Sequence, residues 1–171
     1  AASDGQTPGT FSPTSFLSIA ESMEEPLVTE PSDGRVWVRT RNFRASYGEE
    51  GFTVLPVFGA RSPQEWPVQF KLDSVRRGSA RLALSSKRPK RIAGGVETLH
   101  GSVREVHHLR VDQIEQTFVF DELSGHGDLE VRLNVETELT PRVDGALLRF
   151  EHPEFGYVSY GEAFVIDASG A

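Results

Sequence analysis

Residues 129–139, "LEVRLNVETEL", decide the fold class, because apolar and polar residues alternate along them. Leu or Val stands at nearly every second position, and Glu, Arg and Asn fill the positions between. Successive side chains of a strand point to opposite faces, so this pattern buries one face and leaves the other in water. A helix would scatter the same apolar residues around its circumference. The stretch therefore predicts a strand of an antiparallel sheet.

Similar stretches lie on both sides of this one. Residues 68–75, "VQFKLDSV", also alternate, and residues 114–120, "IEQTFVF", read as another strand. Turn sequences rich in Gly, Pro and Asp separate such stretches roughly every 8 to 14 residues. We therefore expect an all-β fold, an antiparallel β-sandwich of the jelly-roll type, over residues 35–171.

Two further stretches give more specific expectations. Residues 35–47, "RVWVRTRNFRASY", predict one β-rich stretch with Trp37, Phe43 and Tyr47 on the same side. Residues 52–58, "FTVLPVF", predict a strand that is apolar on both faces. Pro56 cannot donate a ladder hydrogen bond, so we expect this strand at a sheet edge or at a bulge.

Residues 1–34 differ in composition and form a separate region. The first 14 are rich in Gly, Pro, Ser and Thr and predict a flexible lead-in. A short amphipathic helix is expected next, with Ser12 as its N-cap and Pro13 in its first turn. Its apolar residues recur at helical spacing. They are Phe16, Ile19, Ala20 and Met23.

Composition limits the class of protein. A chain of 171 residues suits one domain, and 11 Phe, two Trp and three Tyr can fill a core. No apolar run approaches the roughly 20 residues that span a bilayer. The absence of Cys excludes disulfides and thiolate metal sites. The start, "AASDGQTPGT", fits a terminus left by signal peptidase or a cloned fragment, and the turn sequence "DASG" suggests that the native chain continues past Ala171.

Three stretches together resemble a known architecture. They are residues 36–59, "VWVRTRNFRASYGEEGFTVLPVFG", residues 109–139, "LRVDQIEQTFVFDELSGHGDLEVRLNVETEL", and residues 147–170, "LLRFEHPEFGYVSYGEAFVIDASG". They resemble the β-sandwich region that precedes β-propeller or FG-GAP-type repeats in large secreted bacterial proteins. The resemblance covers most of residues 35–171, each motif being a strand and turn pattern. It implies an exported, all-β, non-enzymatic module at the cell surface or outside the cell.

No motif in the chain predicts catalysis, a cofactor or a metal. His107 and His108 are neighbours in a strand, so they face opposite ways and cannot hold one metal together. His107 shares the side of Val103 and Leu109 and should be partly buried, whereas His108 should be exposed. Residues 121–128 contain acids that could begin a calcium site, but their spacing fits a hairpin turn better. Nucleophile-elbow, phosphate-loop and zinc motifs are absent, so no enzyme is predicted.

One basic segment stands out in this acidic chain. Residues 76–96 hold seven of the 18 basic residues and none of the 25 acidic ones, whereas the whole chain has a net charge of -7. The rest of the chain therefore carries a net charge of -14. The seven residues are Arg76, Arg77, Arg81, Lys87, Arg88, Lys90 and Arg91.

The basic segment allows three interpretations. It could be a solvated loop, a contact with another copy of the chain, or a binding site for an anionic surface. Nucleic acid fits poorly, because the body is acidic and the segment has no aromatic residue for stacking. We expect a structural or assembly module, with other copies or another surface protein as partners and self-association into oligomers or filaments. The alternative is a carbohydrate- or surface-ligand-binding module with Trp66 as its platform.

Overall fold

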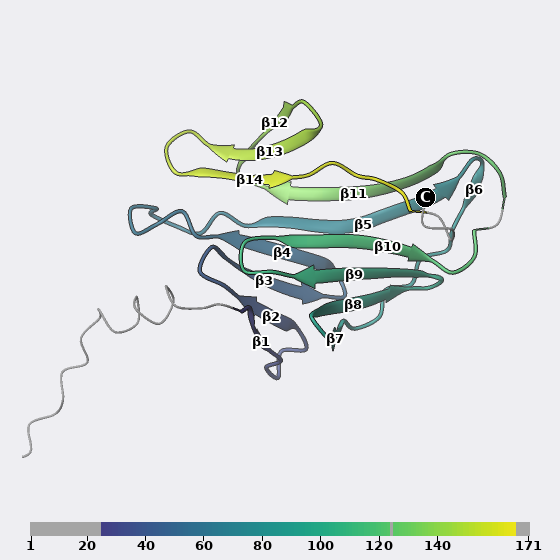
Figure 1. Cartoon of the computed structure of the whole chain (residues 1–171), viewed down its shortest axis with the longest axis horizontal. Coiled ribbons are helices and arrows are strands. Elements are labelled where there is room, and N and C mark those ends of the chain that lie inside the picture. Colours follow the sequence, from purple (N-terminus) through teal and green to yellow (C-terminus); the bar gives the residue numbers. More distant parts are fainter. Residues whose placement is uncertain (1–24, 124, 167–171) are drawn as a thin grey trace, which may run out of the picture.

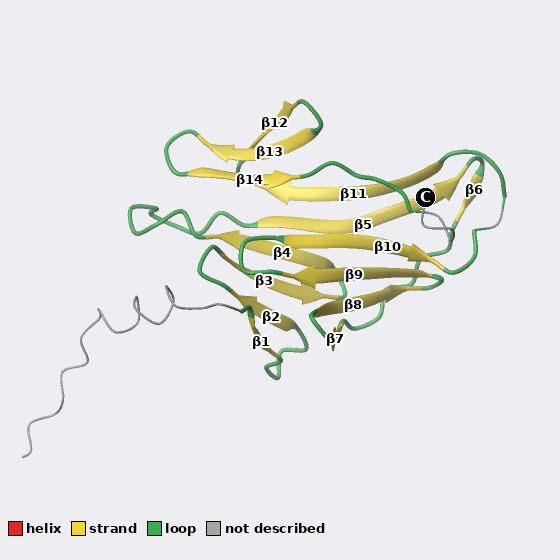
Figure 2. Ribbon diagram, viewed as in Figure 1, coloured by secondary structure: helices red, strands yellow, loops and turns green. Residues whose placement is uncertain are grey.

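The computed structural model describes residues 25–123 and 125–166, and these residues form an all-β protein (Figures 1 and 2). The expected helix lies outside the described residues, apart from Glu25 at its end. In chain order the strands are β1 (Leu27–Thr29), β2 (Val36–Arg39), β3 (Phe43–Gly48), β4 (Gly51–Pro56), β5 (Val68–Arg77), β6 (Ala80–Arg81), β7 (Lys90–Ile92), β8 (Gly95–His100), β9 (Val103–Leu109), β10 (Ile114–Phe120), β11 (Leu129–Thr137), β12 (Thr140–Asp144), β13 (Leu147–His152) and β14 (Gly156–Tyr160).

The strands form three antiparallel sheets. Sheet A has the order β1-β2-β3-β4-β5-β11, with β6 paired to the end of β5; sheet B has the order β10-β9-β8-β7, and sheet C the order β12-β13-β14. Most neighbours in a sheet are also consecutive in the chain. This up-and-down order differs from the Greek-key order of a jelly roll, so the expected sandwich is present but its detailed topology is not the expected one.

Sheets B and C both contribute side chains to the core on the inner face of sheet A. In Figure 1 sheet B overlaps sheet A, and sheet C lies next to β11. Val38, Tyr47 and Phe70 of sheet A are buried in one cluster with Val96 of sheet B and Phe150 of sheet C. Such clustering of the inward side chains from facing sheets is what holds a β-sandwich together. The core thus lies between one large layer and two smaller ones.

Strand β11 confirms the alternation that decides the fold class. Its odd-numbered residues, from Leu129 to Thr137, are half-buried, and the even-numbered residues between them are exposed. It pairs with β5 along the whole length, and Asp73 of β5 is the extra residue where the register shifts. None of the inward side chains of β11 is fully covered, so the sandwich closes less tightly along this strand than at β3.

The expectation for residues 35–47 is wrong in one respect, because a turn divides them into β2 and β3. The Thr40 hydroxyl accepts hydrogen bonds from the backbone N–H groups of Asn42 and Phe43 and so holds this turn. The turn changes the register of the alternation. Phe43 and Tyr47 are buried as expected, but Trp37 faces outward, where its indole N–H donates to Asp33.

The sequence predicts an edge strand or a bulge at Pro56, but β4 is an internal strand between β3 and β5. Pro56 is tolerated because it is the last residue of β4. It pairs with Phe43 of β3, whereas the ladder between β4 and β5 ends at Val54. No neighbouring strand on that side therefore needs the N–H group that Pro56 lacks.

Sheet A begins earlier and the chain ends less regularly than expected. The strand β1 lies within residues 1–34 and pairs with β2, so the sandwich includes residues from Leu27 onward.

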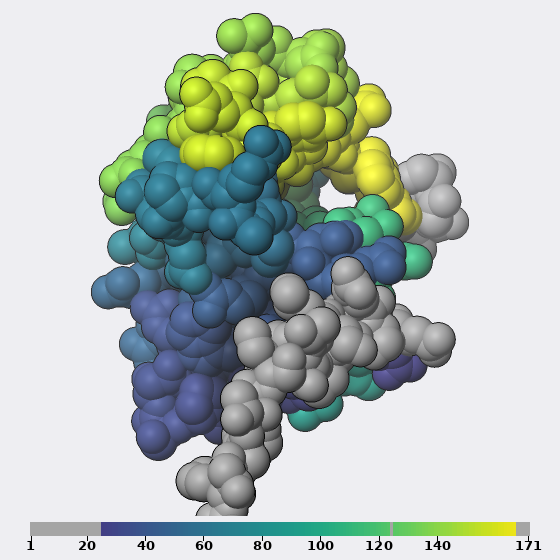
Figure 3. Space-filling view, turned by 90° about the vertical axis from the view of Figure 1, so that its left-hand side faces the viewer, coloured from purple at the N-terminus to yellow at the C-terminus, as the bar shows by residue number. Residues whose placement is uncertain are grey.

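After β14, residues 161–166 are all exposed and belong to no strand. Figure 3 shows this yellow C-terminal segment standing off the body, with an opening beneath it.

Candidate functional site

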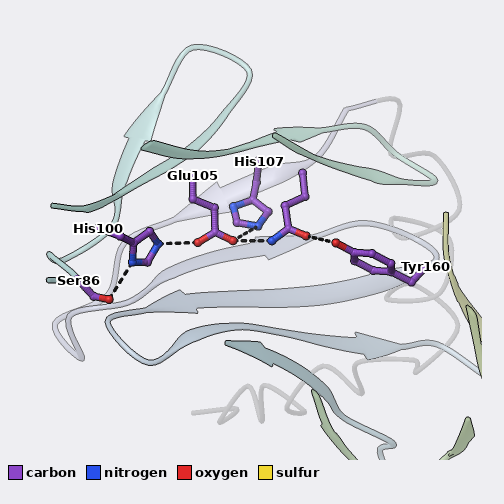
Figure 4. A network of polar contacts seen from close by, with 6 residues as sticks. Ser86, His100, Glu105, His107 and Tyr160 are labelled. Atoms are coloured by element: carbon purple, nitrogen blue, oxygen red, sulfur yellow. Dashed lines mark hydrogen bonds and ion pairs between the residues drawn. The ribbon is translucent and has the colours of Figure 1, made fainter. Parts of the chain in front are cut away.

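A chain of polar contacts crosses the edge of sheet B and is the candidate functional site (Figure 4). The Ser86 hydroxyl lies 2.8 Å from His100 Nδ1, and His100 Nε2 lies 2.7 Å from Glu105 Oε2. His100 and Glu105 are 2% and 3% exposed, whereas Ser86 is exposed. A hydroxyl at the surface is thus connected through an imidazole to a buried carboxylate.

The β8–β9 hairpin brings His100 and Glu105 together. His100 pairs with Val103 across the hairpin, and Glu105 follows Val103 by two residues, so both point to the inner face. The tight turn depends on Gly101, whose φ is +70°. A Cβ at this position would lie 2.7 Å from the carbonyl oxygen of Ala83. The connection from β6 to β7 therefore passes close over the turn and presents Ser86 to His100.

A second branch connects Glu105 to sheet C. The Gln116 amide on β10 donates to Glu105 Oε1, and the Tyr160 hydroxyl on β14 donates to Gln116 Oε1 at 2.7 Å. Burial, and then the charge of Glu105, raise the pKa of the Tyr160 hydroxyl, so it keeps its proton and remains a donor. Four side chains from β8, β9, β10 and β14 thus form one network between two sheets.

His107 is the neighbour of this network and faces the core of sheet A. It is 1% exposed, and its ring lies 4.4 Å from that of Phe52 and 4.9 Å from that of Tyr47, centroid to centroid. Its Nε2 is 3.4 Å from Glu105 Oε1, but neither ring nitrogen has a well-formed hydrogen bond to a described residue. Burial lowers the pKa of His107 to about 4, against the opposing charge of Glu105.

Glu105 remains ionised although it is buried. Burial raises its pKa, but the hydrogen bonds from His100 and Gln116 and the positive field of His107 outweigh that effect and hold the pKa below its ordinary value. A buried carboxylate is stable only when its oxygens are paired in this way. Since His107 is neutral near pH 7, the two hydrogen bonds are the main support for the charge at that pH.

The chemical capacity of the site follows from its order of groups. A hydroxyl, an imidazole and a carboxylate in a row can move a proton from the hydroxyl to the imidazole while the carboxylate stabilises the resulting cation. The Ser86–His100 contact also attaches the β6–β7 connection to sheet B, and Gln116 and Tyr160 extend the network from sheet B to sheet C. No protein-family model matches the chain, and searches of curated proteins and of solved structures found no similar protein.

The basic residues singled out in the sequence do not gather at this site. Arg76 and Arg81 are paired neighbours on β5 and β6 of sheet A, whereas Lys90 and Arg91 lie on β7 of sheet B. Arg88 donates to the Gly34 carbonyl. None of the seven forms an ion pair with a residue that the structure describes, and all except Arg77 are exposed. The segment therefore extends from sheet A to sheet B as positive charge that no described residue pairs.

The contacts of Trp66 reduce the ring surface available for its expected role as a ligand platform. The indole is only part-exposed, its N–H donates to the Ser62 hydroxyl, and its ring lies 4.6 Å from that of His152. Trp66 also packs against the hydrophobic core. These contacts between the loop before β5 and sheet C use part of the ring surface that a sugar would need.

The expectations for the histidines agree with the structure, and His107 is even more buried than expected. His107 is buried and His108 is exposed.

Within residues 25–123 and 125–166 no group of three or more metal-ligating side chains is arranged to hold a metal ion. The same residues include no helix with the length and apolarity that crossing a membrane requires.

Sequence reasoning missed the Ser86–His100–Glu105 relay. The one available signal was Glu105 itself, which stands at an inward position of residues 103–109, "VREVHHL", between Val103 and His107. A charged residue at an inward position must have a buried partner. The pattern could therefore have indicated a buried polar contact, although it could not name the partner.

Proposed function

We propose that this protein is a structural module that associates with other copies of itself, and that residues 161–166 form one of its contacts. The observation that carries the proposal is the exposure of Phe164, Val165 and Ile166, which are 77%, 77% and 66% exposed. Large apolar side chains in a row at the surface are typical of contact sites. The same residues form no backbone hydrogen bond with any described residue, which leaves them free to pair with a strand.

The size of this contact limits its strength. Burial of three such side chains contributes about 1.5–3 kcal/mol each. Association costs about 4–15 kcal/mol in lost freedom of motion. The two amounts are similar, so a single contact is weak and depends on protein concentration. Several contacts per molecule are needed for a stable assembly.

The basic segment supplies a second contact in this proposal. Its seven positive side chains have no ion-pair partner among the described residues, and the remainder of the chain carries a net charge of -14. A second copy therefore offers the opposite charge. Contacts between unlike surfaces continue from molecule to molecule and form filaments or arrays unless the ring closes. The resemblance to sandwich regions of secreted bacterial proteins supports a place outside the cell or at its surface.

The C-terminal contact is tested by Val165→Asp, with Val143→Asp on β12 as its control. Both valines are 77% exposed, so the substitution is the same in chemistry and in starting exposure. We expect Val165→Asp to lower the oligomeric fraction at least tenfold in light scattering and negative-stain images, because it places a charge in an apolar contact. Val143→Asp should leave assembly unchanged. A monomeric wild-type chain at all concentrations, or equal effects of both variants, would contradict the proposal.

The charged contact is tested by salt and by neutralisation. We expect oligomers to dissociate as salt rises from about 50 mM to 500 mM, because ions screen charges beyond about 10 Å at 0.1 M. The triple variant Lys87→Gln, Lys90→Gln and Arg91→Gln should mimic high salt. Its control neutralises three exposed arginines elsewhere, namely Arg39, Arg41 and Arg61. Equal loss in both triple variants would show a general effect of net charge and not a contact at the basic segment.

A further inference from the structure

The Ser86 hydroxyl is placed like an activated nucleophile. It is the exposed end of a relay whose two inner members are almost fully buried. The contacts are 2.8 Å from Ser86 to His100 and 2.7 Å from His100 to Glu105, both within the range of strong hydrogen bonds. The two ring nitrogens of His100 contact different partners, Nδ1 the Ser86 hydroxyl and Nε2 the Glu105 carboxylate. His100 is therefore fixed in its orientation from both sides.

The direction of these hydrogen bonds follows from the carboxylate. An ionised Glu105 can only accept, so His100 Nε2 must carry the proton that points at it. In a neutral imidazole the other nitrogen, Nδ1, then has a free lone pair. The Ser86 hydroxyl must donate to that lone pair. This arrangement draws the proton away from Oγ and makes the oxygen more nucleophilic.

The backbone around Ser86 supplies a further group, the N–H of Ser86 itself. Lys87 N–H donates to the Leu99 carbonyl at 2.8 Å, and Gly101 N–H donates to the Ser85 carbonyl at 3.0 Å. These two bonds flank the bridge between Ser86 and His100. The bridged residues thus form a non-hydrogen-bonded pair, in which the side chains lie close and the N–H groups point away from the opposite strand. The Ser86 N–H has no backbone acceptor among the described residues and is free to bind an oxyanion.

We propose that Ser86 is the nucleophile of an acyl-transfer site that acts on carboxylic esters. Ser86 Oγ attacks the carbonyl carbon of the ester and gives its proton to His100 Nδ1, and the negative charge on the carbonyl oxygen is held by the Ser86 N–H. The carbon–oxygen bond to the alcohol then breaks, and His100 returns the proton to the departing alcohol. Water releases the acyl group by the same steps, with His100 taking a proton from the water and returning it to Oγ.

Glu105 is a positioning residue in this proposal, since it touches His100 and not the substrate. Its charge stabilises the imidazolium that forms during each step. Because Ser86 is exposed, the ester needs no deep pocket and its substituents remain in solvent. We therefore expect slow turnover with little selectivity among small activated esters. This activity is additional to assembly and departs from the sequence-based expectation that the chain is not an enzyme.

The test uses the full chain and a fluorophosphonate probe, which forms a bond between Oγ and phosphorus as fluoride leaves. Ser85 is the internal control, because it is the adjacent, exposed serine and it is Ser86 whose hydroxyl bonds to His100. We expect fragmentation mass spectrometry to find the label on Ser86 at least tenfold faster than on Ser85. Ser86→Ala should remove it. Equal labelling of both serines, or no labelling, overturns the proposal.

A variant of Glu105 distinguishes activation of the Ser86 hydroxyl by the relay from labelling that results only from the exposure of Ser86. Glu105→Gln keeps the shape of the side chain but removes its charge, so we expect labelling of Ser86 to slow at least tenfold and its dependence on pH to change. An unchanged rate in a folded Glu105→Gln chain contradicts the relay. If this variant does not fold, hydrolysis of p-nitrophenyl acetate is compared in the wild-type and Ser86→Ala chains. Faster hydrolysis by the wild type supports the proposal, and equal rates overturn it. Assembly is measured independently by light scattering, so either proposal can fail alone.

Discussion

Acidification from pH 7 to pH 4 is expected to lower the free energy of unfolding by about 3 kcal/mol through His107 alone. Burial holds the pKa of this imidazole at about 4 in the folded chain, against 6.5 for the exposed side chain. The unfolded chain therefore binds a proton near pH 6.5, and the folded chain does so only near pH 4. The stability that the neutral ring provides is complete above pH 6.5 and is lost as the pH falls through this window.

Glu105 adds to the same loss at slightly lower pH. Its folded pKa is held below the ordinary 4.5, so the unfolded chain takes up this proton first and stability falls as pH decreases below that value. Urea unfolding between pH 7.5 and pH 4, followed by Trp fluorescence, measures the combined slope. His107→Gln should remove most of the slope between pH 6.5 and pH 4.5, whereas His108→Gln at an exposed site should keep it. Parallel pH profiles for the wild type and His107→Gln would contradict the assignment.

Replacement of Gly51 by Ala is expected to destabilise the fold by about 3–5 kcal/mol, the sum of a backbone penalty and a steric clash. Gly51 begins β4 with φ at +109°, a conformation that costs any residue with a Cβ. A Cβ there would lie 2.1 Å from the carbonyl oxygen of Phe70 and 3.0 Å from Cα of Lys71. Both atoms are backbone of β5, so β4 would have to move away from its neighbour in the centre of sheet A.

Gly59→Ala is the matched control for that clash. Gly59 also has a positive φ, +89°, but a Cβ there would meet no atom within 4 Å. It should cost only the backbone penalty, about 1–2 kcal/mol. Urea unfolding of both variants measures the difference. Similar losses would show that the backbone conformation, and not the approach of β5, determines the requirement for glycine at position 51.

The fold class could be predicted because alternation is a local property of the sequence. Residues 129–139 show their exposed and buried faces directly, and β11 has the expected face inward. The division between β2 and β3 could not be seen in the same way. The turn there has no Gly or Pro and depends on the Thr40 hydroxyl, which accepts from two backbone N–H groups. Side chains that cap a turn in this way leave only a weak signal in a single sequence.

The candidate site was hidden because its members come together only through tertiary structure. Ser86 and His100 are 14 residues apart and meet at an isolated bridge, while Gln116 and Tyr160 are 44 residues apart and meet between two sheets. Neither separation follows from a motif. Pro56 shows the same limit, since its tolerance in β4 depends on where β5 begins, at Val68 opposite Val54, and not on β4 itself.

The division of the covering layer into sheets B and C affects how the protein comes apart. Strands β12, β13 and β14 are consecutive in the chain and pair only with one another. Their contacts with the rest of the molecule include those of Phe70 with Phe150 and Tyr160, the contact of Trp66 with His152, and the Tyr160–Gln116 hydrogen bond. Leu148 and Val158 also pack against the core. Segments with local pairing and few outside contacts open as cooperative units at a lower free energy than the whole domain. We therefore expect sheet C to open before sheets A and B unfold, and its opening would expose Phe70 and one edge of the core.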